Sequence, residues 1–333
     1  MGRRNTNRTM DHNSHFFGEN GAVEFSLVSA LYNEEKSVGQ LLAGLDEVFS
    51  GTGRSYELVI VDDGSTDGSL QTLKDQIGPI KNLRVVELYK NKGQVAALGA
   101  GMSVARGQWI IMMDGDLQHD AENITRFIEL SDQGHDLVAS YRQTREEKLM
   151  RKMITAVSNR LNRYIVGIQI KDFGSAFRMI HSDVVKAITD SQGCVRYNTP
   201  EIYKNARNLI EIPITQHRRP YGSSKWSLLD FILFNLDLIT ASSRLTQIIL
   251  FISGLGLLTG VALYFMHIFG VFAEVSAISA PVSIAFTSFS LAILAVIWRE
   301  VIEVMKIAKG VPPFLISAIW SDGVADCDQP VKN

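Results

Sequence analysis

Cysteine is scarce in this chain: Cys194 and Cys327 are the only two among 333 residues. They lack the CxxC spacing of zinc and redox sites, and two cysteines cannot build a disulfide framework. Acidic and basic residues nearly balance, with 33 Lys and Arg against 35 Asp and Glu, so the overall charge does not indicate a nucleic-acid partner. No GxGxxG motif follows a strand-like run and no GxxxxGK[ST] motif occurs, so dinucleotide-binding and P-loop sites are not supported.

A secretory signal is also missing from the start of the sequence. Residues 1–22 are polar and contain no apolar core of the kind that a signal peptide requires. We expect these residues to form a disordered N-terminal tail. Strand-like and helix-like patterns begin after it, and we expect residues 23–226 to form one folded domain.

Charged residues are absent from two long stretches of the second half. Leu245–Ala273 and Val275–Trp298 contain no Asp, Glu, Lys or Arg. A helix needs about 20 apolar residues to cross the hydrocarbon core of a bilayer. We therefore predict two transmembrane helices, at about 246–270 and 276–298, within residues 244–299. Buried helices of a soluble protein are the alternative, but two adjacent apolar runs of this length are rare in soluble cores.

Basic residues flank this pair on its outer sides. Arg244 precedes the first stretch, Arg299 and Lys306 follow the second, and the link between them has no basic residue. The positive-inside rule then predicts a hairpin with both ends in the cytoplasm. We accordingly place residues 300–333 in the cytoplasm. Residues 227–243 lie either flat on the bilayer surface as an amphipathic segment or in a buried helix.

Before Arg244, strand-like runs alternate with helix-like runs. The strand-like runs are FSLVSAL (25–31), YELVIVDDGS (56–65, which ends in a polar turn), LRVVELY (83–89), WIIMM (109–113) and DLVASYR (136–142). The segments between them carry helical periodicity or small residues. This alternation predicts an α/β domain with a mostly parallel sheet and helices on both of its faces.

In the stretch WIIMMDGDLQHD (109–120), an apolar run is followed directly by a segment that contains three aspartates. Three further strand-like runs are also followed by polar clusters. The four clusters are Tyr32-Asn33-Glu34, Asp62-Asp63-Gly64-Ser65, Asn91-Lys92-Gly93-Gln94 and the DGDLQ segment that starts at Asp114. Each alone could be a polar turn. Parallel strands of an open α/β sheet end at one edge, however, and ligands bind there. We therefore expect the four clusters to form a single polar pocket.

The order of the motifs YNE, VDDGSTDGS, NKGQVAALGAG, DGDLQ, DFGSAFR and RPYGSSKW carries a family resemblance. From Phe25 to Trp226 the chain resembles the GT-A glycosyltransferases of the family 2 type, and among them the polyprenyl-phosphate glycosyltransferases. The resemblance implies a GT-A-like fold followed by a two-helix membrane hairpin. Ala30 replaces the Pro that usually precedes YNE, which affects the geometry of the strand end. The QxxRW motif of processive polysaccharide synthases is absent.

The resemblance implies a nucleotide-sugar donor and a divalent cation. The implied nucleotide-sugar-binding residues are Tyr32, Asn33, Glu34, Asp62, Asp63, Lys92, Gln94, Asp114 and Gly115. Asp114, Asp116 and Gln118 are the implied ligands of Mg²⁺ or Mn²⁺, which prefer hard oxygen ligands and leave positions open for phosphate. Asp114, Asp116 and Arg178 are the implied catalytic residues. UDP is the first expectation for the nucleotide and GDP the second.

The acceptor implied by the resemblance is the phosphate of a polyprenyl lipid. The matching residues are Arg142, Arg151, Asp172, Arg178, Arg219, Ser224 and Lys225. The guanidinium of arginine donates two hydrogen bonds at once to a pair of phosphate oxygens, whereas the ammonium of lysine acts as a point charge. Asp172 could equally have a structural role, by bonding Arg178.

Together with the two uncharged stretches, the resemblance implies a membrane-bound inverting enzyme that moves one sugar from a nucleotide sugar to polyprenyl phosphate on the cytoplasmic face of a bacterial membrane. Transfer to another lipid such as diacylglycerol is one alternative, and a non-catalytic nucleotide-binding scaffold is another. A transporter fits less well, because two spans without internal repeats make a poor pathway. Small residues in the predicted spans would allow homo-oligomers.

Overall fold

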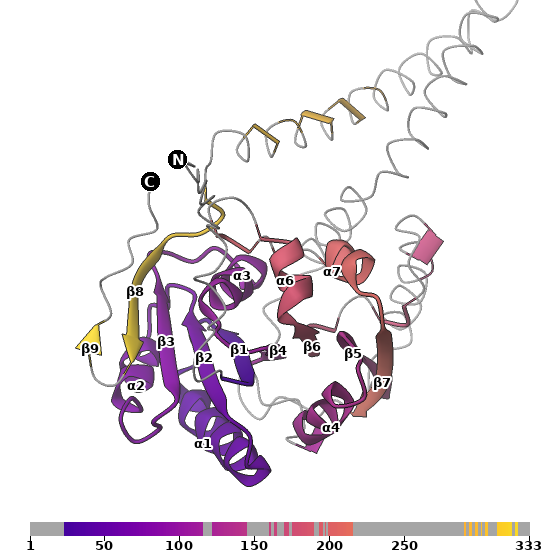
Figure 1. The fold of residues 1–333 in the computed structure, drawn as a ribbon. Helices are drawn as coiled ribbons and strands as arrows, with labels where there is room; N and C mark the ends of the chain where they lie inside the picture. The colour runs from indigo at the N-terminus through magenta and orange to yellow at the C-terminus, as the bar shows by residue number, and fades with distance from the viewer. Residues whose placement is uncertain are drawn as a thin grey trace, which may run out of the picture. The chain divides into compact units, whose positions relative to one another are not determined.

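A nine-stranded sheet organises the described part of the chain, in the strand order β7-β5-β6-β4-β1-β2-β3-β8-β9 (Figure 1). The computed structural model describes residues 23–115, 122–144, 160, 163–164, 170–172, 175–189, 193–195, 197, 199–215, 290, 293–294, 297–298, 301, 304–305, 312–321 and 324–325.

The centre of the sheet consists of four parallel strands. They are β1 (Phe25–Leu31), β2 (Tyr56–Asp62), β3 (Leu83–Leu88) and β4 (Trp109–Asp114). Helices on both faces bury these strands, which explains why the strands read as nearly continuous apolar runs. The four strands and the helices between them were predicted from the sequence, and the structure confirms them.

Helix α1 (Glu35–Thr52) covers one face of the sheet together with α2 (Ser69–Asp75) and α4 (Glu122–Ser131). The apolar residues of α1 recur every three or four positions from Val38 to Phe49. They are buried in the main core with Leu27 and Ile60. The helix ends at Gly53, whose φ of 66° is the left-handed conformation that favours glycine after a helix.

Helix α3 (Gln94–Val104) packs on the opposite face, against β1 and β2. A side chain on Gly101 would begin only 2.5 Å from Val28 Cγ1 and 2.9 Å from Val61 Cγ2, so this glycine lets the helix approach the sheet closely. Close packing places the start of α3 directly beside the carboxyl ends of the central strands.

Both margins of the sheet contain antiparallel pairs. On one side β4 pairs with β6 (Arg178–His181), and β6 pairs with β5 (Leu137–Thr144), which continues in parallel to β7 (Leu209–Thr215). On the other side β3 pairs with β8 (Ile316–Ser321), followed by β9 (Val324–Ala325). The prediction of a mostly parallel sheet therefore describes the centre, and the sequence analysis had identified only β5 among these outer strands. Short helices α6 (Ser182–Ala187) and α7 (Thr199–Asn205) follow β6.

Strand β8 attaches the C-terminal segment to the sheet. The Trp320 indole Nε1–H donates to Glu87 Oε2 at 3.1 Å, and the Lys74 ammonium lies 3.9 Å from the centre of the Trp320 ring. Just before the strand, the buried Phe314 packs on α3. Residues that follow the predicted membrane hairpin are thus part of the same sheet as β1.

The chain divides into two compact units. One contains residues 1–153, 170–225 and 313–333, and the other contains residues 154–169 and 226–312. Among the described residues, no helix is long and apolar enough to span a membrane. Most of the two predicted spans, 246–270 and 276–298, lies outside the described residues, as do the predicted tail (1–22) and the segment 227–243.

Candidate functional site

The carboxyl ends of the central strands form one polar edge. Leu31 at the end of β1 is aligned with Asp62 in β2, and Ala30 is aligned with Asp114 in β4. The chain moves from β1 outward to β3 and then returns to the other side of β1, so β1 and β4 form the point where the strand order reverses. Ligands of open α/β sheets bind at such a point. The structure therefore brings the described residues of the four sequence-predicted clusters to one edge; of the fourth cluster these are Asp114 and Gly115.

The loops after β1 and β2 are joined by hydrogen bonds. The backbone N–H of Asn33 donates to Ser65 Oγ at 3.0 Å, and Asn33 Oδ1 accepts the N–H of Thr66 at 2.8 Å. The next N–H, of Glu34, donates to Ser69 Oγ at 2.8 Å. Asn33 has a φ of 54°, a left-handed conformation that asparagine tolerates better than most residues. The side chains of Tyr32 and Glu34 are half-buried in this pair of loops.

Asp63 holds the loop that leads into α3. Its two carboxylate oxygens accept the backbone N–H groups of Lys92 and Gly93, at 2.7 and 2.9 Å. Gly93 has a φ of 87°, so the turn before α3 needs a glycine. Burial raises the pKa of Asp63, although these two hydrogen bonds lower it. The contacts give Asp63 a positioning role that its place in the sequence did not reveal.

Asp62 makes a different set of contacts. Its Oδ2 accepts the N–H of Ser65 at 3.0 Å, while its buried Oδ1 has no hydrogen-bond partner among the described residues. The residue is 1% exposed, and burial raises the pKa of its carboxyl group. A buried acceptor atom without a partner is uncommon in folded proteins, and a ligand would reach this one only if the loop around it moved.

Gln94 and Asp114 connect α3 to the end of β4. The Gln94 side-chain amide donates a hydrogen bond to Asp114 Oδ1, and both side chains reach the surface of the edge. A side chain on Gly115 would start 2.0 Å from Leu31 Cδ2, so a larger residue after Asp114 would force the end of the Leu31 side chain to move. The other two predicted metal ligands, Asp116 and Gln118, lie outside the described residues. Within the described part of the chain, no group of three or more His, Cys, Asp and Glu could hold a metal ion.

On the acceptor side, Arg142 and Asp172 form a two-point ion pair. Arg142 Nε and Nη2 donate to the two oxygens of Asp172 at 2.6 and 2.9 Å. Both side chains are largely buried. The pair joins strand β5 to the segment before β6. Four predicted acceptor residues, Arg151, Arg219, Ser224 and Lys225, lie outside the described residues.

Arg178, at the start of β6, is 1% exposed. Its guanidinium donates to the Ser175 carbonyl oxygen and, at 3.5 Å, to Thr199 Oγ1. The rings of Tyr197 and Tyr203 lie 5.9 and 5.5 Å from the guanidinium carbon, within the range of a cation–π interaction.

Burial lowers the pKa of Arg178, but the surrounding groups, including Asp172 and Asp114, raise it overall, so the cation is maintained. Tyr203 is also buried here, and burial raises the pKa of its hydroxyl group to about 12. The sequence analysis missed both tyrosines, because nothing in their local sequence points toward Arg178.

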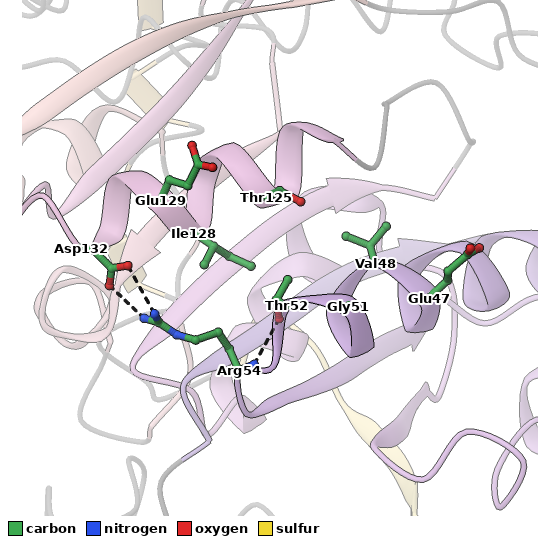
Figure 2. A pocket seen from close by; sticks show the side chains of 9 residues that line it. All are labelled: Glu47, Val48, Gly51, Thr52, Arg54, Thr125, Ile128, Glu129 and Asp132. Atoms are coloured by element: carbon green, nitrogen blue, oxygen red, sulfur yellow. Dashed lines mark hydrogen bonds and ion pairs between the residues drawn. The ribbon is translucent and has the colours of Figure 1, made fainter.

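A pocket of about 530 Å³ lies elsewhere, between α1 and α4 (Figure 2). Figure 2 shows Arg54 beside Asp132, with Val48 and Ile128 lining the same pocket. Arg54 precedes β2, so the pocket lies at the amino ends of the strands. None of the residues that the sequence analysis selected lines it.

Comparison with known proteins identifies relatives of this chain. The family model described as glycosyl transferase family 2 matches residues 26–189. Undecaprenyl-phosphate 4-deoxy-4-formamido-L-arabinose transferase of Edwardsiella ictaluri is 34% identical over 65% of this chain and 66% of its own length. The protein of the same name from Pseudomonas fluorescens is 32% identical over 73% of each chain. Dodecaprenyl-phosphate galacturonate synthase of Rhizobium johnstonii is 33% identical over 66% of each chain.

The matches to the Edwardsiella ictaluri and Rhizobium johnstonii proteins span just under two thirds of the length of those proteins. Among solved structures, TarS 1-349 of S. aureus in complex with UDP-GlcNAc matches with a TM-score of 0.45 and 20% identity, over 66% of each chain.

Proposed function

Because this chain belongs to glycosyl transferase family 2, we propose that it transfers a sugar from a nucleotide sugar to a polyprenyl phosphate. The observation that carries the proposal is the single polar edge. There, a buried oxygen of Asp62 without a partner in the described part of the chain, the loop that Asp63 holds and the Gln94–Asp114 contact lie together. The names of the curated relatives, which act on undecaprenyl or dodecaprenyl phosphate, support the choice of acceptor.

The donor nucleotide binds along the loops after β1, β2 and β3. Asp62 Oδ1 accepts a hydrogen bond from the nucleoside, since it is the buried acceptor that lacks a partner among the described residues. Tyr32, Asn33 and Glu34 line the same edge. Asp63 shapes the site by holding the N–H groups of Lys92 and Gly93, which orients the start of α3 toward the phosphates.

The donor set Asp114, Asp116 and Gln118 fits Mg²⁺ or Mn²⁺, because all three side chains offer hard oxygen atoms. Asp114 supports this fit, since its carboxylate reaches the edge of the site and is oriented by Gln94. The bound cation would neutralise the charge that builds on the nucleoside diphosphate as it leaves.

On the acceptor side, the arginines compensate the negative charge of the lipid phosphate. The Arg142–Asp172 pair holds one guanidinium in place, and the buried Arg178 supplies a fixed positive charge near Asp114. Arg151, Arg219, Ser224 and Lys225 complete the proposed phosphate site.

A phosphate oxygen attacks the anomeric carbon from the side opposite the diphosphate. The new carbon–oxygen bond forms as the bond to the nucleoside diphosphate breaks, with inversion. The phosphate is already ionised near neutral pH, so positioning and charge carry the catalysis.

A membrane hairpin at about 246–270 and 276–298 explains how the enzyme reaches a lipid acceptor. The helical residues described near its end have exposed apolar side chains, including Leu294, Ile297, Trp298 and Val301. Strands β7 and β8 lie in one sheet, so the chain between them leaves that sheet and returns to it. An even number of membrane crossings fits this path, with the catalytic unit and both ends of the hairpin in the cytoplasm.

The test uses the full chain in detergent with a short-chain polyprenyl phosphate, Mg²⁺ or Mn²⁺, and a panel of radiolabelled UDP- and GDP-sugars. Label that moves into the organic phase with one donor, and stops moving when a chelator is added, is the expected result. Asp114→Asn should abolish this transfer. Asp75→Asn, an exposed carboxylate at the end of α2, is the matched control and should retain it. Folded protein that labels no lipid with any donor would refute the proposal.

A further inference from the structure

Arg178 is a buried cation that forms no ion pair with a carboxylate among the described residues. Its side chain and backbone together are 1% exposed. Asp172, which the sequence analysis considered as its partner, instead accepts hydrogen bonds from Arg142 with both carboxylate oxygens, at 2.6 and 2.9 Å. Burying a charged group is costly unless other groups compensate for the lost contact with water. The surroundings of Arg178 must therefore stabilise its guanidinium in another way.

Aromatic rings and uncharged oxygen atoms provide this stabilisation. The Arg178 guanidinium donates to the Ser175 carbonyl oxygen and, at 3.5 Å, to Thr199 Oγ1. The rings of Tyr197 and Tyr203 lie 5.9 and 5.5 Å from its central carbon, and the electron-rich face of an aromatic ring attracts a cation. Burial raises the pKa of Tyr203 to about 12, so its hydroxyl group stays protonated near neutral pH. These contacts hold the cation without pairing it with a carboxylate.

The strand register places this cation at the carboxyl edge of the sheet, on the same face as Asp114. Arg178 is aligned with Met112 in the antiparallel pair of β6 and β4, so their side chains lie on one face. Asp114 follows Met112 by two positions in the same strand and shares that face. Val28, which is aligned with Met112, packs against α3, so α3 covers this face, and its Gln94 contacts Asp114. The charge of Asp114 is also among those that raise the pKa of Arg178.

We propose that Tyr197 and Tyr203 are positioning residues for sugar transfer, and that their rings take the place of a carboxylate counter-ion for Arg178. A carboxylate beside the guanidinium would cancel most of its charge at a distance. An aromatic ring is neutral, so it holds the guanidinium and leaves the positive charge in place. This inference deepens the function proposed above and rests on it.

The positive charge that is kept in this way acts on a phosphate group. Arg178 need not touch that group, because charges interact more strongly in the interior of a protein than in water. The phosphate belongs either to the nucleoside diphosphate that leaves or to the lipid acceptor. In both cases the charge of Arg178 stabilises negative charge at the carboxyl edge during transfer.

A double-mutant cycle in the organic-phase transfer assay tests the proposal with the full chain in detergent. Tyr203→Leu removes the ring and Tyr203→Phe keeps it. Each is made in the parent and in Arg178→Met, which replaces the cation with an unbranched apolar side chain. We expect Tyr203→Leu to lower kcat/KM about tenfold in the parent but less than about twofold in Arg178→Met, because no cation remains to be held. Tyr203→Phe should retain most of the parent rate, and Tyr197→Leu should follow the pattern of Tyr203→Leu.

The kinetic constants also identify the phosphate. A loss confined to kcat would support the proposal with the leaving diphosphate as the target, and a rise in KM for the lipid would support it with the acceptor phosphate as the target. Equal losses from Tyr203→Leu in both backgrounds would overturn the proposal. A Tyr203→Phe variant as slow as Tyr203→Leu would also overturn it.

Thermal unfolding of the same variants separates this inference from the proposed reaction. A contact between ring and cation predicts that Tyr203→Leu lowers Tm by roughly 2–4 °C more in the parent than in Arg178→Met, and equal shifts would overturn the proposal. Tyr56→Leu is the matched control, because the Tyr56 ring stacks on Phe49 at 5.0 Å, at the amino end of β2. It should lower Tm equally in both backgrounds and leave kcat/KM unchanged. A parent that transfers no sugar would refute the proposed function and the positioning role together, whereas the Tm difference would still establish the contact.

Discussion

Asp63→Asn tests the division of roles between the two adjacent aspartates at the end of β2. The carboxylate of Asp63 accepts two backbone N–H groups, at 2.7 and 2.9 Å. Asparagine offers one oxygen, and its amide would face the second N–H as a competing donor. Loss of one hydrogen bond to a charged group costs about 2–3 kcal/mol. We expect the apparent melting temperature to fall by roughly 5–10 °C.

Asp62→Asn is the matched variant and should behave in the opposite way. Its side chain keeps an oxygen for the N–H of Ser65, and the charge disappears from the buried oxygen that has no partner among the described residues. Burial raises the pKa of Asp62 above its ordinary 3.8 in the folded chain, so the stability that this group contributes is highest in acid and is lost as the pH rises through the folded pKa. The variant should therefore match the parent in acid and equal or exceed its melting temperature at neutral pH.

Thermal unfolding in detergent between pH 4 and pH 8, together with equilibrium binding of UDP and GDP, measures both variants. We expect Asp62→Asn to weaken nucleotide binding by roughly tenfold, the loss of about one hydrogen bond, without loss of stability. Asp63→Asn should reduce stability most at neutral pH, where the ionised carboxylate accepts both N–H groups. Burial also raises the pKa of Asp63, so the difference from the parent should shrink toward pH 4 as this carboxyl group protonates. If Asp62→Asn destabilises the protein and Asp63→Asn does not, the assignment of the two roles is wrong.

Three further variants or treatments test other parts of the structure. Arg142→Lys keeps the charge but loses the two-point contact with Asp172, so kcat/KM for the polyprenyl phosphate should fall about tenfold in initial-rate assays, with the KM for the donor unchanged. An effect confined to the donor would place Arg142 on the other side of the site. Trp320→Phe removes the hydrogen bond to Glu87 and should lower the melting temperature by roughly 2–4 °C, which calorimetry can measure; no change would mean that β8 contributes little to the sheet through this contact. A chelator should stop sugar transfer, and added Mn²⁺ should restore it; full activity in the chelator would remove the proposed role of Asp114 as a metal ligand.

The sequence predicted the structure well where a local pattern of apolar residues matches the burial of the segment. The central strands are buried on both faces, so their apolar runs were visible before the structure was known. Parallel strands end at one edge, which is why the clusters after Leu31, Asp62 and Asp114 could be expected to converge. Membership of the family followed from the order of these motifs.

Contacts between distant parts of the chain could not be predicted in this way. Strand β8 joins β3 from the far end of the sequence, and the apolar–polar pattern of ISAIWS gave no sign of its partner. Arg178 likewise meets Tyr197, which lies before α7, and Tyr203 within α7 only in the folded chain.

The different roles of Asp62 and Asp63 also depended on the tertiary structure. In sequence they are identical neighbours, and composition predicts the same chemistry for both. The side chains of successive residues at a strand end point in different directions. One therefore meets the N–H groups of the next loop, and the other keeps an oxygen without a partner among the described residues. The sequence alone determined that carboxylates lie at this edge, and only the packing of the β3–α3 loop against β2 decided which of the two holds that loop and which keeps an oxygen without a described partner.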